Sequence, residues 1–238
     1  MTARLIKRHT KTAMFMHWFN AVCWLFLLAT GMGLIQNENL MLAGGIWPRW
    51  MRAIFGGGDG LLLAHEIVGL VWAGVFFLYG ILCAKREVIP FIREIFAISP
   101  GRDLSWLLKK GTRMTLGRRT LTRFGINPTL PDQGFYNVGQ KLFAVPSLFG
   151  GIIIGITGLI MFFSDKFITN TTWVQWAIWI HFVTVGLVFA GLFIHVYMAS
   201  IAAGERPAFK SMFTGTVPDT YAKGHHRLWY DQINQEGK

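Results

Sequence analysis

The sequence predicts an all-α integral membrane protein, built as a bundle of four transmembrane helices. Of the 238 residues, 53% are hydrophobic and only 15% are charged, whereas about a quarter of the residues of a soluble domain are charged. The apolar residues are also clustered in four long segments, whose only formal charge is Glu66. Each segment exceeds the roughly 20 residues that cross a ~30 Å hydrocarbon core. Helices are expected there because each one satisfies its own backbone hydrogen bonds.

We expect one membrane domain that takes the whole chain, residues 1–238. Its helices are expected at about residues 13–36, 61–84, 142–164 and 173–203. The segment 85–141 is then a loop outside the membrane, and the segment 204–238 is a tail.

The net charge of +11 is distributed along the chain in a way that excludes a nucleic-acid partner. Twenty of the 23 Lys and Arg residues precede the first span, follow the fourth or lie in 85–141, and three lie in the other two loops. Because four spans are an even number, the part before the first span, the segment 85–141 and the part after the fourth span all lie on the same side of the membrane. Segments rich in Lys and Arg remain in the cytoplasm. The sequence therefore predicts a multi-pass protein of the bacterial cytoplasmic (inner) membrane. Both termini and 85–141 are cytoplasmic, and the partner around the spans is membrane lipid.

Four histidines within the spans can be ordered by depth. At about 1.5 Å per residue, His17 lies about 6 Å and His195 about 12 Å from the inner ends of their helices. His65 and His181 lie about 6 and 12 Å from the outer ends. His181 and His195 project from nearly the same face of one helix, roughly 21 Å apart along its axis. Depth thus defines an outer pair, His65 with His181, and an inner pair, His17 with His195.

Two imidazole pairs at two depths predict two b-type haems, because haem iron accepts two axial histidines. Polar groups inside a membrane also tend to mark function. Zinc is disfavoured because two histidines leave its shell unfilled, and no CxxCH motif for covalent haem occurs. The competing interpretation of any one histidine is an interhelical hydrogen bond. The glycines of the third span are attributed to helix packing; they are Gly150, Gly151, Gly155 and Gly158.

Five segments, in chain order, resemble the cytochrome b (gamma) subunit of respiratory membrane-bound formate dehydrogenases. "MHWFNAVCWLFLLATG" and "LLLAHEIVG" resemble its first two ligand helices, and "YNVGQK" resembles the segment before its third helix. "IHFVTVGLVFAGLFIHVYMA" resembles its double-ligand helix, and "YAKGHHRLWYDQI" resembles its cytoplasmic tail. The resemblance implies the same pairing as depth does. His65 and His181 would hold the outer haem b, and His17 and His195 the inner haem b.

The resemblance also implies a complex with an iron–sulfur beta subunit and a molybdopterin alpha subunit that contains Mo or W. Electrons from formate would cross from the outer to the inner haem and reduce a quinone, either menaquinone or ubiquinone. The chain has no visible pterin, nicotinamide or iron–sulfur motif, so it would transfer electrons and would not oxidise formate alone. A higher oligomer of the complex also fits.

The resemblance places a quinone site beside the inner haem, formed by Asn137, Gln140 and His195. Asn137 and Gln140 would then hydrogen-bond a quinone oxygen. The residues themselves favour a helix cap equally, because Asn is a preferred N-cap and Gln three positions later completes a capping box.

Two other functions compete with this interpretation. One is the cytochrome b subunit of a nickel–iron hydrogenase or of another molybdopterin enzyme, although "YNVGQK" and "AKGHHRLWY" favour the formate type. The other is a haem-free membrane anchor or transporter. In the tail, His225 and His226 would point about 100° apart on a helix, and a solvated or headgroup-facing position is expected for both. The segments 55–60 and 113–134 are assigned no role.

Overall fold

The computed structural model of the protein describes residues 4–164, 170–202 and 204–236. Ala203, where the fourth predicted helix ends, lies outside the described residues, as does Lys166, one of the three basic residues of the outer loops. The chain divides into two compact units. Unit 1 contains Met1–His9, Lys85–Leu148 and Gly191–Lys238, and unit 2 contains Thr10–Ala84 and Phe149–Ala190. The assignment of the chain to a single membrane domain stays a prediction.

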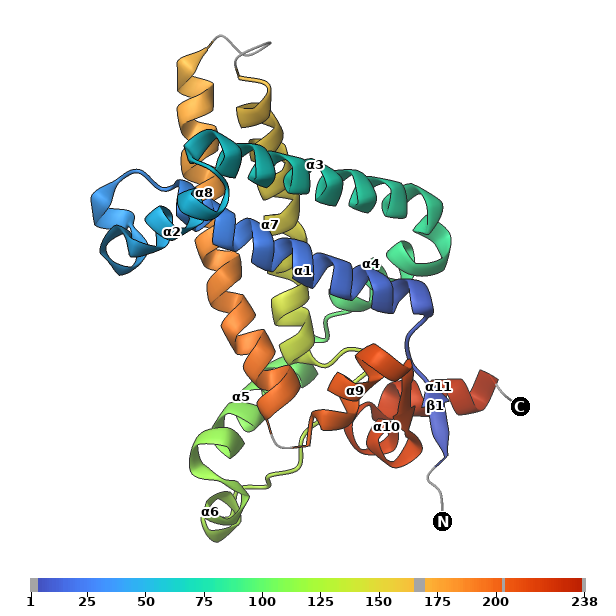
Figure 1. The fold of residues 1–238 in the computed structure, drawn as a ribbon. Coiled ribbons are helices and arrows are strands. Elements are labelled where there is room, and N and C mark those ends of the chain that lie inside the picture. The colour runs from blue at the N-terminus through green and yellow to red at the C-terminus, as the bar shows by residue number, and fades with distance from the viewer. Residues whose placement is uncertain (1–3, 165–169, 203, 237–238) are drawn as a thin grey trace. The chain divides into compact units, whose positions relative to one another are not determined.

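Unit 2 contains most of the long helices drawn in Figure 1. Its elements are α1 (Lys11–Leu34), η1 (Glu38–Leu40), η2 (Leu42–Gly45), α2 (Ile46–Ile54), α3 (Gly58–Leu82) and large parts of α7 (Val138–Phe162) and α8 (Thr171–Val196). The remaining elements are β1 (Leu5–Lys7), η3 (Ala84–Val88), α4 (Ile89–Phe96), α5 (Pro100–Leu116), α6 (Arg118–Arg123), η4 (Tyr197–Ile201), α9 (Arg206–Thr214), β2 (Thr216–Pro218), α10 (Asp219–His225) and α11 (Arg227–Glu236).

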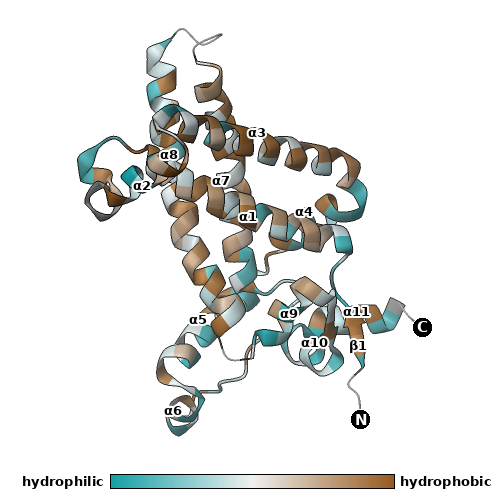
Figure 2. Cartoon of the chain, viewed as in Figure 1, coloured by the Kyte–Doolittle hydropathy of each residue, from teal (hydrophilic) through white to brown (hydrophobic). Residues whose placement is uncertain are grey.

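Four helices in the described residues are long and apolar enough to cross a membrane, which confirms the predicted all-α membrane fold. They are Lys11–Leu34, Gly58–Leu82, Val138–Phe162 and Thr171–Ile201. Figure 2 shows hydrophobic residues along most of α3. The helices α1 and α7 begin a few residues earlier than predicted because polar side chains cap them. For α1 the cap is Thr10, whose hydroxyl accepts from the N–H of Ala13 at 3.0 Å.

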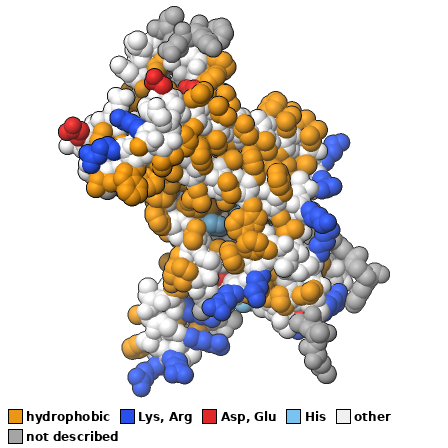
Figure 3. Space-filling model, in the orientation of Figure 1, with side chains coloured by type: hydrophobic (Ala, Val, Ile, Leu, Met, Phe, Trp, Pro, Cys, Tyr) orange, Lys and Arg blue, Asp and Glu red, His pale blue; other side chains and the backbone are white. Residues whose placement is uncertain are grey.

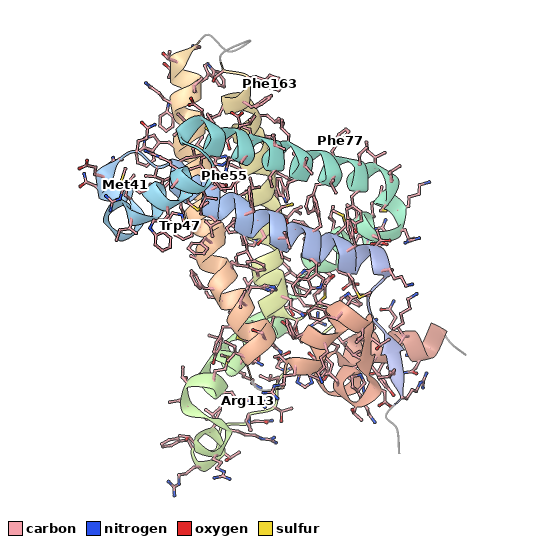
Figure 4. The ribbon with its side chains drawn as sticks, viewed as in Figure 1. Met41, Trp47, Phe55, Phe77, Arg113 and Phe163 are labelled. Atoms are coloured by element: carbon pink, nitrogen blue, oxygen red, sulfur yellow. The ribbon has the colours of Figure 1, made fainter. Side chains whose placement is uncertain are left out.

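Unit 2 is apolar outside and polar at several points inside. Phe77 on α3, which is labelled in Figure 4, is 69% exposed, and Leu187 on α8 is 70% exposed. Thr30 on α1, in contrast, is fully buried. This pattern reverses that of a soluble domain, because lipid accepts apolar side chains whereas polar groups must find partners within the protein.

The glycines of α7 pack against large side chains from the other helices of unit 2. Gly150 lies so close to Val188 on α8 that an added Cβ would be 2.5 Å from its methyl group. Gly151 and Gly155 lie against the ring of Trp72 on α3. The packing role expected for these three glycines agrees with these contacts.

The indole of Trp72 also donates a hydrogen bond to Asn20 Oδ1 on α1 at 2.9 Å. Trp72 therefore joins α1, α3 and α7 through one polar bond and one apolar face. The helices α1 and α3 form one pair, and α7 and α8 form the other. A second contact between these helix pairs is the stacking of Trp24 of α1 on Phe189 of α8, with ring centroids 6.4 Å apart.

The loop between α1 and α3 folds back on the end of α1. Trp47 of α2 donates from its indole to the carbonyl of Ala29 at 2.9 Å, and Phe55 meets Phe26 edge-on at 6.0 Å; Trp47 and Phe55 are labelled in Figure 4. Gly60, in the first turn of α3, lies so close to Phe55 that an added Cβ would collide with the Phe55 carbonyl oxygen. The segment 55–60, which the sequence analysis left without a role, is thus a tight turn that only glycine permits at this point.

In unit 1 the two ends of the chain form one antiparallel pair of strands. Strand β1 pairs with β2, with Ile6 opposite Val217. Both residues join Tyr221, Ala222 and Trp229 in a small buried core. Because β1 precedes the first span and β2 follows the last, this pairing requires that both ends of the chain lie on the same side of a membrane.

The segment before α7 is attached to the same small core. Arg8 donates from Nη2 to the carbonyl of Phe135 at 2.6 Å, and its guanidinium lies over the rings of Phe135 and Trp229, at 4.6 and 5.1 Å. The backbone N–H of Leu228 donates to the carbonyl of Gln133 at 3.1 Å. The end of the segment 113–134 therefore contacts the tail and holds it against the small core.

The expectation that His226 is solvated is wrong. His226 is fully buried, and its Nδ1 lies 2.8 Å from the carbonyl of Gly134. His225 is exposed, as expected, and stacks on Tyr221 at 4.4 Å. The burial of His226 leaves no local signal in the sequence, because its partner is 92 residues away in the chain.

Basic side chains lie mainly in unit 1. Figure 3 shows Lys and Arg side chains gathered on α5 and α6. Arg113, labelled in Figure 4, is exposed at the last turn of α5. Lys110 instead turns inward and forms an ion pair with Glu205 at 3.3 Å, and Glu205 also accepts from the hydroxyl of Tyr221 at 3.0 Å. This pair attaches α5 to the tail.

The buried His226 predicts that acid destabilises unit 1. Burial, and secondly the charge of Arg8, lower the pKa of His226 from 6.5 to about 3. Between these values the unfolded chain binds a proton that the folded chain does not, so stability falls as the pH drops below 6.5, by about 1.4 kcal/mol per pH unit. We expect the Tm of the wild type to fall more between pH 7 and pH 5 than that of His226→Gln, whose amide does not titrate. An equal fall in both proteins would contradict the assignment.

Candidate functional site

The outer histidine pair lies wholly within unit 2. His65 is in the second turn of α3, and His181 is in the middle of α8. The structure thus places the two residues that depth had paired within one unit, and their pairing around one haem stays a prediction.

Each of these rings contacts a threonine on another long helix: the ring on α3 contacts a threonine on α1, and the ring on α8 contacts a threonine on α7. The Nδ1 of His65 lies 2.8 Å from Oγ1 of Thr30 on α1. The Nδ1 of His181 lies 3.0 Å from Oγ1 of Thr157 on α7. Both threonines are buried, at 0% and 6% exposure. The same contact thus occurs twice, once in each helix pair.

These two threonines were not among the residues expected at the site. The available signal was the dipeptide Thr-Gly, which occurs at Thr30–Gly31 and again at Thr157–Gly158, each time inside an apolar span. Both glycines face the histidine that their threonine contacts. Of the four α7 glycines attributed to packing, Gly158 is the one that packs against a predicted haem ligand.

The inner histidine pair is divided between the units. His17 lies on α1 in unit 2, where Trp18 meets it edge-on at 5.2 Å. His195 lies on α8 in unit 1, where its ring stacks on Phe143 of α7 with centroids 4.3 Å apart and planes inclined by 14°. The pairing of His17 with His195 stays a prediction.

Asn137 and Gln140 form a reciprocal capping box at the start of α7. The backbone N–H of Gln140 donates to Asn137 Oδ1 at 3.0 Å, and the backbone N–H of Asn137 donates to Gln140 Oε1 at 2.9 Å. The structure thus contains the helix cap that the sequence offered as the alternative to quinone binding at these two residues. Both bonds use the amide oxygens, so each NH₂ group is left to donate elsewhere. Capping and ligand binding are therefore compatible at these two residues.

The capping box belongs to the same unit as His195. Phe143, which stacks on His195, follows Gln140 by one helical turn. Tyr136, which precedes the box, is buried, and this burial raises its pKa to about 12, so that Tyr136 keeps its proton at neutral pH. The segment from Tyr136 to Phe143 thus offers amide donors beside the predicted inner ligand.

An apolar cavity of about 500 Å³ lies between the C-terminal half of α7 and the N-terminal half of α8. Its lining includes Ile153, Ile160, Trp173 and Trp176, and Thr157 is one of its two polar contacts. Neither His65 nor His181 lines it, although Thr157 both lines the cavity and contacts His181.

The outer pair fits the axial ligation of a haem iron. A neutral histidine that keeps a proton on Nδ1 presents the lone pair of Nε2 to a metal, and both rings engage a threonine through Nδ1. Within the described residues, no three His, Cys, Asp or Glu side chains gather as a protein-only metal site would need. Two imidazoles are sufficient for haem, whose porphyrin supplies the other iron ligands.

Known proteins resemble this chain over nearly its whole length. The sequence model of the family described as prokaryotic cytochrome b561 matches residues 8–215. The formate dehydrogenase cytochrome b556 subunit of Haemophilus influenzae is 24% identical over 228 residues, which cover 94% of this chain and 82% of the relative.

Two relatives come from Escherichia coli K12. The cytochrome b556(fdo) subunit of formate dehydrogenase is 24% identical over 236 residues, covering 97% of this chain and 94% of the relative. The cytochrome b556(Fdn) subunit of the nitrate-inducible formate dehydrogenase is 22% identical over 223 residues, covering 92% and 87%.

Proposed function

Because the chain belongs to the prokaryotic cytochrome b561 family, we propose that it is the cytochrome b subunit of a formate dehydrogenase complex. In this role it carries electrons across the membrane from an iron–sulfur subunit to a quinone. The observation that carries the proposal is the outer pair, two histidines from different helix pairs with Nε2 of each ring left for a metal. The names and the nearly complete coverage of the relatives support the choice of formate dehydrogenase.

The cofactor proposed is haem b, in two copies. His65 and His181 would hold the outer haem, and His17 and His195 the inner haem. When bound, haem b supplies the one-electron redox chemistry. The chain would contribute the imidazole nitrogens that hold the iron, an apolar surround that excludes water, and the depth of each pair in the membrane.

The quinone site proposed lies at the start of α7. The NH₂ groups of Asn137 and Gln140 would donate to a quinone oxygen while their carbonyl oxygens continue to cap the helix. His195 would complete the site from α8. The stacking of Phe143 on His195 supports this location, because it brings the first turns of α7 to the predicted inner ligand within one unit.

The orientation proposed puts both termini and the segment 85–141 in the cytoplasm of a bacterium, with the chain in the inner membrane. The contacts that join β1, Phe135 and the tail in unit 1 support this, because they hold the three basic segments on one side. The quinone would then take its protons from the cytoplasm. The iron–sulfur subunit would meet the opposite side, together with a catalytic subunit containing molybdopterin.

We expect the purified chain to contain two haems b, as measured by pyridine haemochrome assay. His65→Ala and His181→Ala should each remove the same haem, because each deletes one axial ligand of the outer site. In native membranes, formate should reduce both haems and hydrogen should not. A haem content near zero, or loss of different haems in the two variants, would contradict the assignment, and reduction by hydrogen alone would favour a hydrogenase subunit.

A cysteine placed at exposed Thr112 should react with an impermeant thiol reagent only from the cytoplasmic side of sealed membranes. The matched control is Asn39→Cys in the loop between α1 and α2, which should react only from the other side; both positions are exposed. Both tests use a background in which Cys23 and Cys83 are replaced. If Thr112→Cys reacted only from the outer side and Asn39→Cys only from the cytoplasmic side, the proposed orientation and the proposed direction of electron transfer would both be reversed.

Two isosteric changes separate quinone binding from helix capping. Asn137→Asp and Gln140→Glu keep the oxygens that cap α7 and remove the NH₂ donors. Loss of a hydrogen bond worth roughly 0.5–1.5 kcal/mol should weaken quinone binding by up to about tenfold in each variant. Haem content and Tm should stay at the wild-type level. The readout is quinone-dependent turnover on preparations of known haem content.

The control for the change of Asn to Asp is Asn127→Asp, an exposed loop residue whose Oδ1 likewise accepts a backbone N–H, that of Thr129. Asn137→Ala, in contrast, deletes the cap and should cost about 1 kcal/mol of helix stability as well. Wild-type quinone kinetics in the double variant Asn137→Asp/Gln140→Glu would show that the quinone binds elsewhere.

A further inference from the structure

The two histidines of the outer pair have the same surroundings, although they come from different helices. Beside each ring lies a threonine followed by a glycine, Thr30–Gly31 for His65 and Thr157–Gly158 for His181. The two dipeptides belong to different helices of unit 2, so the likeness does not come from one shared element.

The direction of each hydrogen bond follows from the single proton of a threonine hydroxyl. Thr30 donates that proton to carbonyls one turn back, at 2.9 Å from Phe26 O and 3.2 Å from Leu27 O. Its oxygen therefore accepts the proton on Nδ1 of His65. The protonated nitrogen is thus Nδ1, and Nε2 is the nitrogen with the free lone pair.

The same reasoning applies to His181. Thr157 donates to the carbonyl of Ile153 at 2.7 Å and lies 3.2 Å from that of Ile154, so its oxygen accepts from Nδ1 at 3.0 Å. The protonated nitrogen of His181 is therefore also Nδ1, and its Nε2 has the free lone pair.

Gly31 lets the imidazole of His65 approach α1 closely. A Cβ at Gly31 would lie 3.3 Å from Cε1 of His65, which is tighter than ordinary contact. A larger residue there would push the ring away from the Thr30 hydroxyl. A Cβ at Gly158 would lie 3.6 Å from Cε1 of His181, an ordinary van der Waals distance, so the threonine is the feature that both sites require.

We propose that Thr30 and Thr157 are positioning residues for the outer haem, an inference that rests on the proposed function. Each fixes the tautomer and the orientation of one axial histidine and makes its Nε2 a stronger donor to iron. A more basic ligand favours the ferric state, so the pair lowers the reduction potential of the outer haem. Both threonines contact outer ligands, at His65 and His181, so the effect is expected at the outer haem.

The test compares Thr30→Val and Thr157→Val, which keep the shape and remove the hydroxyl, with Thr30→Ser and Thr157→Ser, which keep the hydroxyl. In the Val variants, the outer-haem midpoint potential from a spectroscopic redox titration should rise, and the affinity of the site for haem should fall by about 10–100-fold. The low-spin ferric EPR signal of the outer haem should shift with the potential. The inner haem should be unchanged, and the Ser variants should restore the wild-type values.

Thr184→Val on α8 is the matched control. Thr184 lies against Gly150, one turn of α8 after His181, and the hydroxyls that engage the two Nδ1 atoms belong to Thr30 and Thr157, so this change should leave both potentials at the wild-type values. If a Val variant yields no folded chain, Thr→Ala at the same position removes the hydroxyl without adding a methyl group, and the unchanged inner haem reports a folded chain.

Two results separate the possible failures. If the Val variants keep the potential, EPR signal and content of the outer haem, while His65→Ala and His181→Ala lose it, the role of the threonines is overturned and the proposed function stands. If the histidine variants retain both haems, the proposed function itself fails, and the threonines position no haem ligand.

Discussion

The structure depends on the absence of hydrogen-bond partners in the hydrocarbon core of a membrane. Every polar side chain placed there must find its partner on another part of the same protein, and unit 2 shows how this is done. The hydroxyls of Thr30 and Thr157 donate to carbonyls of their own helices and accept from a histidine on another. The Trp72 indole finds Asn20 in the same way. These few bonds hold apolar helices in a defined arrangement.

Outside the spans, the chain is organised by a different principle, the burial of a small mixed core. Strands β1 and β2 join the two ends of the chain, and Arg8 and His226 attach the segment before α7 to that core. The side chain of Gln133 accepts from the N–H of Val138, the first residue of α7, at 3.1 Å. The tail therefore holds the start of α7 in place, next to the capping box of Asn137 and Gln140.

The capping box shows that a structural and a functional interpretation of the same residue can both hold. A side-chain amide has an accepting oxygen and a donating nitrogen. In Asn137 and Gln140 the oxygen completes the helix and the nitrogen remains for a ligand. The same division of labour occurs at His65 and His181, where one ring nitrogen engages the protein and the other is left for a metal.

The sequence by itself determined the four spans, the depth of each histidine and the uneven distribution of basic residues, because hydropathy and helical rise are properties of neighbouring residues. It also contained the capping box, whose two members are three positions apart. Only the tertiary structure decided the pairing of β1 with β2, the burial of His226 and the threonine partners of the histidines. Thr30 is 35 residues from His65, and His226 is 92 residues from Gly134. Contacts over such separations leave no periodic signal in the sequence, since they depend on how whole helices and strands pack together.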